Sequence, residues 1–309
     1  MLTWSLDKQH TLAAASAIEG IGLHSGVNVS LRLLPAPSGT GVIFRRTDLN
    51  GFMIEANHRN VARVSYATSL MKKGVLISTT EHLLSALAAS QVDNVFVEID
   101  SLEVPILDGS ALPFLRLITQ VGLQRQRARR VYFKVMQPVE VVEGEKRIAV
   151  YPSASFRATY RIAFPHPLIG MQELTFEMGK NSYEREIAPA RTFGFIEEVE
   201  MLRKSGLVRG GSLENAVVLS RDGILNPEGL RFPDEFCRHK ILDLIGDLAL
   251  FGHPLIGHVV AERAGHAMHV ALVRSMLRQK GALSIVESEP LDPAKLPKPR
   301  VGLSSPALP

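Results

Sequence analysis

Several features of common protein classes are missing from this chain of 309 residues. Cys237 is the single cysteine, so an internal disulfide is excluded, which fits a reducing compartment such as the cytoplasm. No stretch reaches the roughly 18 consecutive apolar residues of a membrane-spanning helix. The first residues lack a cationic segment followed by an apolar run, so we expect neither a signal peptide nor an integral membrane segment.

The chain also has little excess of either sign of charge, since the formal net charge is only +4. Residues 124–130 (QRQRARR) form the one basic run, and no aromatic residue is interleaved with it. Nucleic-acid-binding segments usually combine a basic stripe with such aromatics. We therefore interpret 124–130 as a solvated linker and expect no nucleic-acid partner.

Apolar residues, in contrast, make up 46% of the chain, which is ample for two cores, and the length predicts about two domains. Each half opens with strand-like stretches between Gly-rich or Pro-rich turns, at 11–17, 27–34 and 42–46 and then at 131–136, 139–142 and 147–151. Helix, strand and helix follow at 80–89, 94–100 and 108–121, and again at 232–250, 258–261 and 266–278. A further helix is predicted at 197–204.

The two halves also match in spacing. The interval from His82 to Gly109 equals that from His239 to His266, so the same order of elements recurs at the same offsets. Such matched offsets predict an old duplication, with the two histidine-bearing helices packed between the halves. We expect domains at 1–127 and 128–285, and a Pro-rich tail at 286–309.

Helix 232–250 carries the strongest chemical pattern. Its apolar residues recur at three- and four-residue steps, and acidic residues stand in its first turn. His239 and Asp243 are four residues apart, so both side chains leave the same helix face. An imidazole and a carboxylate so placed can bind one metal ion, although an exposed partner pair is the commoner explanation of this motif alone.

A second histidine-bearing helix strengthens the metal interpretation. His82 lies in the first turn of helix 80–89, so two histidines and Asp243 would supply three protein ligands. This leaves a fourth position for water, as in catalytic zinc sites. Glu81 is then a candidate base for that water, and Asp247 could hydrogen-bond a ligand or a catalytic histidine.

Other residues remain open to two interpretations. His266 follows Gly265 at a predicted helix start, where a histidine is either structural or a general acid. Lys240 is either a solvated helix residue or a contact for an anionic substrate group. His24 is either a turn residue or a contact to a polar ligand, and the aromatics of 191–195 (RTFGF) are more typical of a core.

The remaining candidates are interpreted as structural. Cys237 stands two residues before His239 and so points to a different helix face, which favours a buried spectator over a thiolate ligand. Four histidines have no motif around them and are interpreted as surface or helix-cap residues: His166, His253, His258 and His269.

Seven segments together resemble one family. They are, in order and with compatible spacing, GIGLHSG, STTEHLLSAL, DNVFVEID, VPILDGSALPF, ARTFGF, LNPEGLRFPDEFCRHKILDLIGDL and the Gly265-His266 pair. This set is similar to the UDP-3-O-acyl-N-acetylglucosamine deacetylases, the zinc amidases of lipid A biosynthesis. The resemblance implies an α+β fold of two similar domains, each a β-sheet packed on helices, with the helices sandwiched between the two sheets. Ser65 and Glu198 depart from the family pattern.

The resemblance also implies a role for each candidate residue. Zn²⁺ is held by three ligands: His82, His239 and Asp243. Glu81 is the general base, His266 is the catalytic histidine, and Asp247 orients it. Lys240 lies near the substrate, and Thr192 assists the oxyanion. Two aromatics line the sugar site and an apolar passage for the acyl chain: Phe193 and Phe195. With these parts, His24 is a candidate substrate contact.

The implied reaction is hydrolysis of the N-acetyl group of UDP-3-O-(3-hydroxyacyl)-N-acetylglucosamine. It releases acetate and UDP-3-O-(3-hydroxyacyl)-glucosamine, the committed step of lipid A biosynthesis. One alternative is an amidohydrolase of the same architecture that acts on another acylated sugar, because a fold does not fix the substrate. Another is a binding module that lost the chemistry, but such a module would be expected to lack Glu81 or a ligand. We expect no fused second enzyme, because the tail is too short to form a domain. We expect a cytoplasmic monomer.

Overall fold

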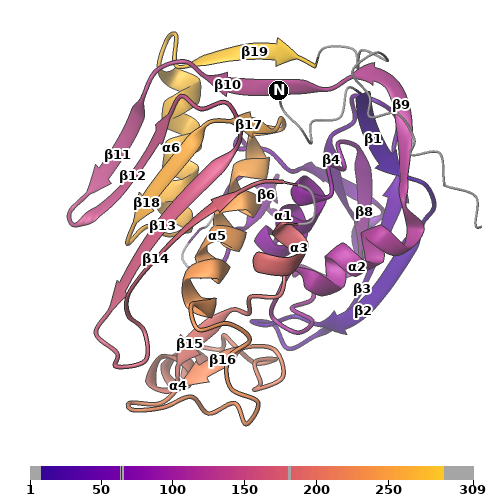
Figure 1. Ribbon diagram of the computed structural model, residues 1–309. Helices are drawn as coiled ribbons and strands as arrows, with labels where there is room; N and C mark the ends of the chain where they lie inside the picture. The colour runs from indigo at the N-terminus through magenta and orange to yellow at the C-terminus, as the bar shows by residue number, and fades with distance from the viewer. Residues whose placement is uncertain (1–7, 63, 65, 180–181, 289–309) are drawn as a thin grey trace, which may run out of the picture.

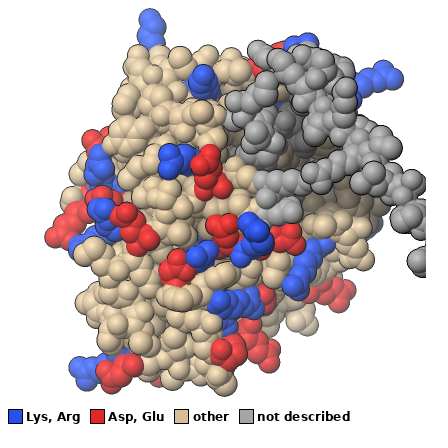
Figure 2. All heavy atoms as spheres, in the orientation of Figure 1, with Lys and Arg blue, Asp and Glu red and all other residues tan. Residues whose placement is uncertain are grey.

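The computed structural model describes residues 8–62, 64, 66–179 and 182–288. Ser65 and the predicted tail from 289 onward therefore lie outside the described residues. Among those described, no helix is both long enough and apolar enough to cross a membrane. Figure 2 shows one face, on which cationic and anionic side chains are intermixed, as the small net charge leads one to expect.

Two five-stranded sheets form the outer layers of the molecule (Figure 1). The first has the order β2 (Ser16–Ile21), β3 (Asn28–Pro35), β8 (Val95–Ile99), β4 (Val42–Arg46) and β5 (Phe52–Glu55). The second has the order β11 (Val139–Glu143), β12 (Lys146–Tyr151), β18 (His258–Glu262), β13 (Arg157–Phe164) and β14 (Gly170–Glu177). The middle strand of each sheet is antiparallel to one neighbour and parallel to the other. This shared topology confirms two similar halves and the α+β class.

The helices lie between the two sheets. They are α1 (Glu81–Ala89), α2 (Leu112–Val121), α5 (Glu235–Leu248) and α6 (His266–Arg278). Helix α2 contacts β2 and α1, whereas α5 contacts β13 and β14, and α6 contacts β11 and β12. The pair α1 and α5 meets in the middle of the molecule (Figure 1). The predicted packing of the two histidine-bearing helices against each other is confirmed.

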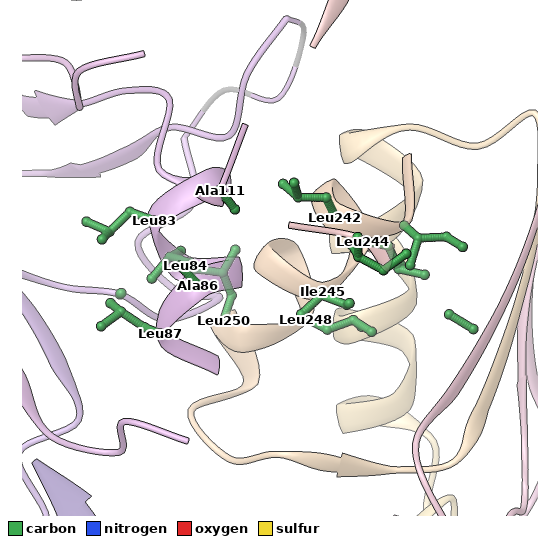
Figure 3. Packing of buried hydrophobic residues seen from close by; sticks show 14 of the residues in the cluster. Leu83, Leu84, Ala86, Leu87, Ala111, Leu242, Leu244, Ile245, Leu248 and Leu250 are labelled. Atoms are coloured by element: carbon green, nitrogen blue, oxygen red, sulfur yellow. The ribbon is translucent and has the colours of Figure 1, made fainter. Parts of the chain in front are cut away.

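Burial explains why these segments take these forms. Alternate residues of β3 and β8 are buried on the inner face of the first sheet, as the period of two for a half-buried strand requires. Helix α1 is buried on nearly all sides, and both α2 and α5 pack against it. Its leucines belong to the same continuous core as Leu244, Ile245 and Leu248 of α5, with Leu83 and Leu87 on the side away from α5 (Figure 3).

The closest approach of α1 and α5 occurs at a glycine. A Cβ atom on Gly246 would lie 2.1 Å from the backbone oxygen of Glu81, so only a hydrogen fits there. One turn away, the Ser85 hydroxyl donates a hydrogen bond of 2.8 Å to the Leu242 carbonyl. These two contacts fix the register of the helix that carries Glu81 against the helix that carries Asp243.

Smaller elements complete the fold. Two-stranded sheets pair β1 (Lys8–Leu12) with β9 (Leu123–Arg129), β6 (Leu70–Lys72) with β7 (Val75–Ile77), and β15 (Phe193–Phe195) with β16 (Val217–Leu219). A three-stranded sheet has the order β17 (Leu255–Ile256), β10 (Val131–Val135) and β19 (Leu283–Glu287). Short helices are α3 (Ser182–Glu186), α4 (Ile196–Lys204) and the 3₁₀ turns η1 (Thr47–Leu49) and η2 (Ala249–Phe251).

Two local predictions were wrong. Residues 124–130 are not a linker, because β9 covers most of them and pairs with β1, which leaves their polar side chains mostly outward. The helix predicted at 108–121 begins only at Leu112. Asp108 and Ser110 lie in the turn before it, where Asp108 Oδ1 accepts hydrogen bonds from the amide and hydroxyl of Ser110. The expected domain boundaries fall inside β9 and β19, and the division into domains stays a prediction.

Candidate metal centre and active site

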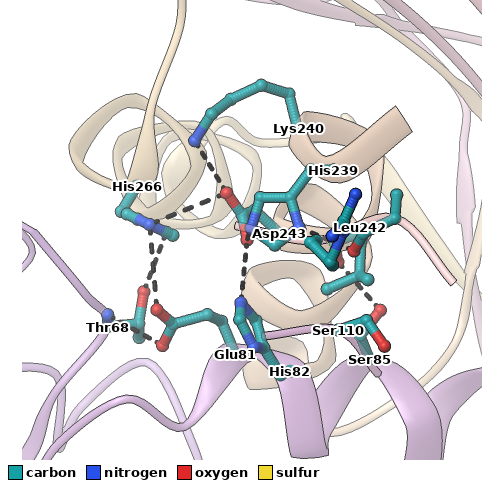
Figure 4. A network of polar contacts seen from close by, with 12 residues as sticks. Thr68, Glu81, His82, Ser85, Ser110, His239, Lys240, Leu242, Asp243 and His266 are labelled. Atoms are coloured by element: carbon teal, nitrogen blue, oxygen red, sulfur yellow. Dashed lines mark hydrogen bonds and ion pairs between the residues drawn. The ribbon is translucent and has the colours of Figure 1, made fainter. Parts of the chain in front are cut away.

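Three side chains from α1 and α5 converge on one space between the helices (Figure 4). Asp243 Oδ1 lies 3.6 Å from His82 Nε2 and 3.3 Å from His239 Nε2. All three side chains are buried, and their candidate ligand atoms lie within 4.8 Å of one another. The predicted trio of His82, His239 and Asp243 is thus brought together by the fold.

The chemistry of these atoms fits a divalent cation. Asp243 Oδ1 is buried and has no hydrogen-bond partner among the described residues, which is costly unless a ligand binds there. His239 Nδ1 donates to the Ala190 carbonyl at 3.0 Å, which leaves the lone pair of Nε2 directed at the same space. Burial lowers the pKa of His239 to about 3, so the imidazole stays neutral, as a metal ligand must be.

Asp243 is held in its charged form. Burial opposes ionisation, but the polar groups that face the carboxylate, among them the Lys240 ammonium, outweigh it and bring the pKa of Asp243 well below its usual value. Lys240 Nζ donates to Asp243 Oδ2 at 2.7 Å, which leaves Oδ1 available as a ligand. Of the two interpretations of Lys240, the one in which it faces the site agrees with this contact.

Glu81 lies beside this trio at the start of α1. Its Oε2 accepts a hydrogen bond of 3.0 Å from the Thr68 amide, and its Oε1 is 3.9 Å from His266 Nε2. Burial raises the pKa of Glu81, against the opposing effect of the neighbouring His266. A carboxylate with a raised pKa, next to a candidate metal site, is suited to accept a proton.

His266 is paired with Asp247, as predicted. Its Nδ1 donates to Asp247 Oδ2 at 2.7 Å, while Thr68 Oγ1 donates to the other oxygen of Asp247 at 2.5 Å. Burial opposes a charge on His266, but Asp247, Asp243 and Glu81 outweigh it and raise its pKa to about 9. His266 Nε2 therefore carries a proton close to the candidate metal site, 3.9 Å from Asp243 Oδ2.

Sequence reasoning missed two residues of this cluster. His269 is not a surface or cap residue, because it is fully buried and its Nδ1 donates to Asp247 Oδ2 at 2.8 Å. Its position three residues after His266, on the same helix face, was a usable signal. Thr68 carried no such signal, since it comes from an irregular segment that only the fold brings to Glu81 and Asp247.

The group of Asp247, His266 and His269 has the composition of a metal site but is already hydrogen-bonded. Both imidazoles direct Nδ1 at the same carboxylate oxygen, at 2.7 and 2.8 Å. These distances are those of donor and acceptor rather than of ligands around an ion.

The predicted substrate residues surround this centre unevenly. The ring of Phe193 lies 6.5 Å from that of His239 and 5.9 Å from Lys240 Nζ, so it borders the site. Phe195 lies further along β15, against Phe164 at 5.9 Å and His166 at 5.7 Å. His166 is itself buried and contacts the Ser220 carbonyl through Nε2, so its interpretation as a surface residue was wrong.

Thr192 and His24 both lie outside the helices and strands. The Thr192 amide donates to the Gly109 carbonyl at 2.8 Å, which joins the segment before β15 to the loop before α2. The His24 amide donates to Glu103 Oε1, and its carbonyl accepts from the Arg209 amide. Both ring nitrogens of His24 are buried and have no hydrogen-bond partner among the described residues.

A cavity of about 430 Å³ opens beside Lys240. Its charged lining residues are of both signs, namely Glu143, Glu145, Lys146 and Arg263, and Phe164 adds an apolar surface. Arg263 is paired with Glu145, so Lys146 and Lys240 are the lysines of this lining.

The site combines three buried candidate metal ligands, a neighbouring carboxylate and a histidine–carboxylate pair. This combination is that of a metal-dependent hydrolase. Comparison with known proteins gives the particular family. A family model described as UDP-3-O-acyl N-acetylglycosamine deacetylase matches residues 9–278. The chain belongs to this family, whose members deacetylate an acylated UDP-sugar in lipid A biosynthesis.

Individual relatives agree in name and extent. The protein named UDP-3-O-acyl-N-acetylglucosamine deacetylase from Solibacter usitatus is 55% identical, over 88% of this chain and 92% of its own length. Proteins of the same name from Myxococcus xanthus and Neisseria meningitidis serogroup A are 48% and 46% identical, each over 90% of this chain. The family resemblance inferred from the motifs is confirmed.

Proposed function

We propose that this deacetylase uses a bound Zn²⁺ to hydrolyse the N-acetyl group of UDP-3-O-(3-hydroxyacyl)-N-acetylglucosamine, releasing acetate. The observation that carries the proposal is the convergence of three buried donors beside Glu81. The ligands would be His82 Nε2, His239 Nε2 and Asp243 Oδ1, a set of imidazoles and one carboxylate that suits zinc. When bound, the ion would polarise the acetamide carbonyl and lower the pKa of water.

Glu81 is the general base in this proposal. The Thr68 amide holds Oε2, so the Glu81 carboxylate is fixed in orientation and Oε1 is turned toward His266. Its raised pKa favours uptake of the proton that the attacking water loses. The same carboxyl group can then return that proton to the leaving amine.

His266 acts beside Glu81, since its Nε2 lies 3.9 Å from Glu81 Oε1. Because Nδ1 is hydrogen-bonded to Asp247, the proton on Nε2 is the one available to the substrate. It can stabilise the oxyanion or protonate the leaving amine, and we propose that His266 and Glu81 share the second task. The Thr192 hydroxyl would assist the oxyanion.

The substrate would extend from this centre in two directions. Lys240, with Lys146 in the adjoining cavity, would contact the diphosphate of a UDP-sugar. Phe193 and Phe195 would line the sugar site and the passage for the acyl chain, with His24 as a further polar contact.

The wider setting of the enzyme is also a proposal. We propose that the two sheets and their helices correspond to domains 1–127 and 128–285. We further propose that the chain acts as a monomer in the cytoplasm. The buried thiol of Cys237, whose pKa burial raises to about 12, fits a reducing compartment. Light scattering of the purified protein tests the monomer.

The function is tested by mass-spectrometric detection of acetate loss from the acylated UDP-sugar, with and without a chelator. His239→Ala should lose bound metal and activity together, since it removes a ligand. Arg238→Ala is the matched control on the same helix, because Arg238 pairs with Asp234 and should keep both. Full metal occupancy in His239→Ala would show that α5 does not carry the metal site.

A further inference from the structure

A buried polar chain extends from the active site into the second half of the molecule. It consists of His266, Asp247, His269 and Tyr160, and ends at the backbone carbonyl of Ala264. The side chains of Asp247 and His269 are entirely buried, as is Tyr160. Burying polar side chains is costly unless each of them is hydrogen-bonded. The hydrogen bonds of these four side chains are therefore worth following one by one.

The direction of each hydrogen bond follows from the donors available. The carboxylate of Asp247 can only accept, so Nδ1 of His269 carries the proton that lies between them. Burial lowers the pKa of His269 despite the adjacent Asp247, which keeps the ring neutral and leaves Nε2 as an acceptor. The Tyr160 hydroxyl lies 3.0 Å from Nε2, within hydrogen-bond distance of it.

Tyr160 lies within reach of two acceptors. Its hydroxyl also lies 2.8 Å from the Ala264 carbonyl, but it has a single proton. The proton is therefore shared between the carbonyl and Nε2 of His269. The hydroxyl contacts the His269 ring at Nε2 while Asp247 contacts it at Nδ1, so the ring is held at both nitrogens.

The consequence concerns Asp247. Its carboxylate receives three donors, from His266 and His269 on Oδ2 and from Thr68 on Oδ1. Three donors fix both the position of the carboxylate and its rotation, whereas two would leave Oδ2 held by His266 alone. Because Asp247 in turn orients His266, the aim of His266 Nε2 at the substrate depends on His269.

We propose that His269 is a positioning residue for the deacetylation reaction. It holds Asp247 in place for His266, and Tyr160 in turn holds His269. This inference rests on the proposed role of His266. Histidine suits the position because its two ring nitrogens reach Asp247 and Tyr160 at once. A leucine reaches neither, an asparagine can replace only Nδ1, and a glutamine can replace only Nε2.

The test compares His269→Asn with His269→Gln, whose side chains carry the same amide group at different distances from the backbone. The asparagine keeps a donor to Asp247 and should stay within about threefold of the unsubstituted kcat. The glutamine and His269→Leu lose that donor and should reduce kcat by at least about tenfold, because a misdirected His266 is a poor proton donor. KM and metal content should change by less than about twofold, since neither the ligands nor the substrate contacts are altered.

Tyrosine variants supply the matched control. Tyr160→Phe removes the hydroxyl that holds His269 and should lower kcat a few-fold. Tyr183→Phe removes an equally buried hydroxyl, bonded to Ser85 at 2.7 Å, outside this chain of residues. It should leave kcat unchanged. The proton NMR signal of His266 Nδ1–H, shifted downfield by its carboxylate partner, should move in Tyr160→Phe and not in Tyr183→Phe.

The outcomes separate the possibilities. The proposal is overturned if His269→Asn and His269→Gln are equally active, or if a folded, metal-loaded His269→Leu keeps kcat within about twofold. Should His269→Leu fail to fold, the asparagine and glutamine pair still decides. Failure of the proposed function would look different, because the unsubstituted, metal-loaded protein would then release no acetate while the NMR signals still reported the pairing.

Discussion

Replacing Gly246 by alanine tests how the two halves of the site are held together. Gly246 lies in the interior of α5, where alanine is favoured over glycine by about 1 kcal/mol, so helix propensity alone predicts stabilisation. The structure predicts the opposite. The added Cβ would lie 2.1 Å from the oxygen, 2.8 Å from the carbonyl carbon and 3.0 Å from the Cα of Glu81.

The expected size of the effect of Gly246→Ala follows from the atoms that the added Cβ would contact. Separations below 3.0 Å are essentially never found for a real Cβ, and the atoms here are backbone that cannot rotate aside. Helix α1 must therefore move by roughly 1 Å, a displacement that can cost on the order of 100-fold in rate when it affects catalytic groups. Overpacking a core costs about 1–3 kcal/mol, which exceeds the propensity gain, so the free energy of unfolding should also fall.

The measurement is kcat, metal content and thermal unfolding of Gly246→Ala. We expect a roughly 100-fold loss of kcat, weaker metal binding because His82 moves with Glu81, and a lower melting temperature. Gly223→Ala is the control, since its Cβ would meet its nearest neighbour at an ordinary 3.5 Å. A fully active and more stable Gly246→Ala would refute the claim that this contact sets the position of α1.

Three further predictions follow from the site. Glu81→Gln should keep the metal and lose at least about 100-fold in rate, the lower end of general-base contributions; near-normal turnover with metal bound would exclude Glu81 as the base. The pH profile of kcat/KM should be bell-shaped. It should rise as Glu81, whose pKa burial raises, loses its proton, and fall as His266 loses its own. A bound metal ion would oppose a positive charge on His266. The falling limb should therefore lie between the ordinary histidine pKa of about 6.5 and the raised pKa of about 9 for His266. This limb should shift or vanish in His266→Gln. Phe195→Ala should weaken binding of long-chain substrates by about 1–3 kcal/mol, measured against an analogue without the acyl chain; equal effects on both would identify Phe195 as core.

Local sequence rules predicted the helices of the site well. Helix α6 begins at His266 and ends at Arg278 as expected, and α1 begins within one residue of its predicted start. These segments were predictable because their apolar periodicity and flanking residues act within the segment itself. The strand at 124–130 was not, since its pairing with β1 joins residues far apart in the chain.

The sequence by itself determined the candidate ligand types, their spacing along α5 and the family. His239 and Asp243 share a helix face through helix geometry alone, so no tertiary contact is needed to place them together. Only the tertiary structure decided that His82 faces them from another helix and that Gly246 permits this approach. It alone also decided that Thr68 and His269 complete the hydrogen bonds of Asp247, because Thr68 comes from the first half of the chain and His269 from α6, which packs on α5 only in the folded protein.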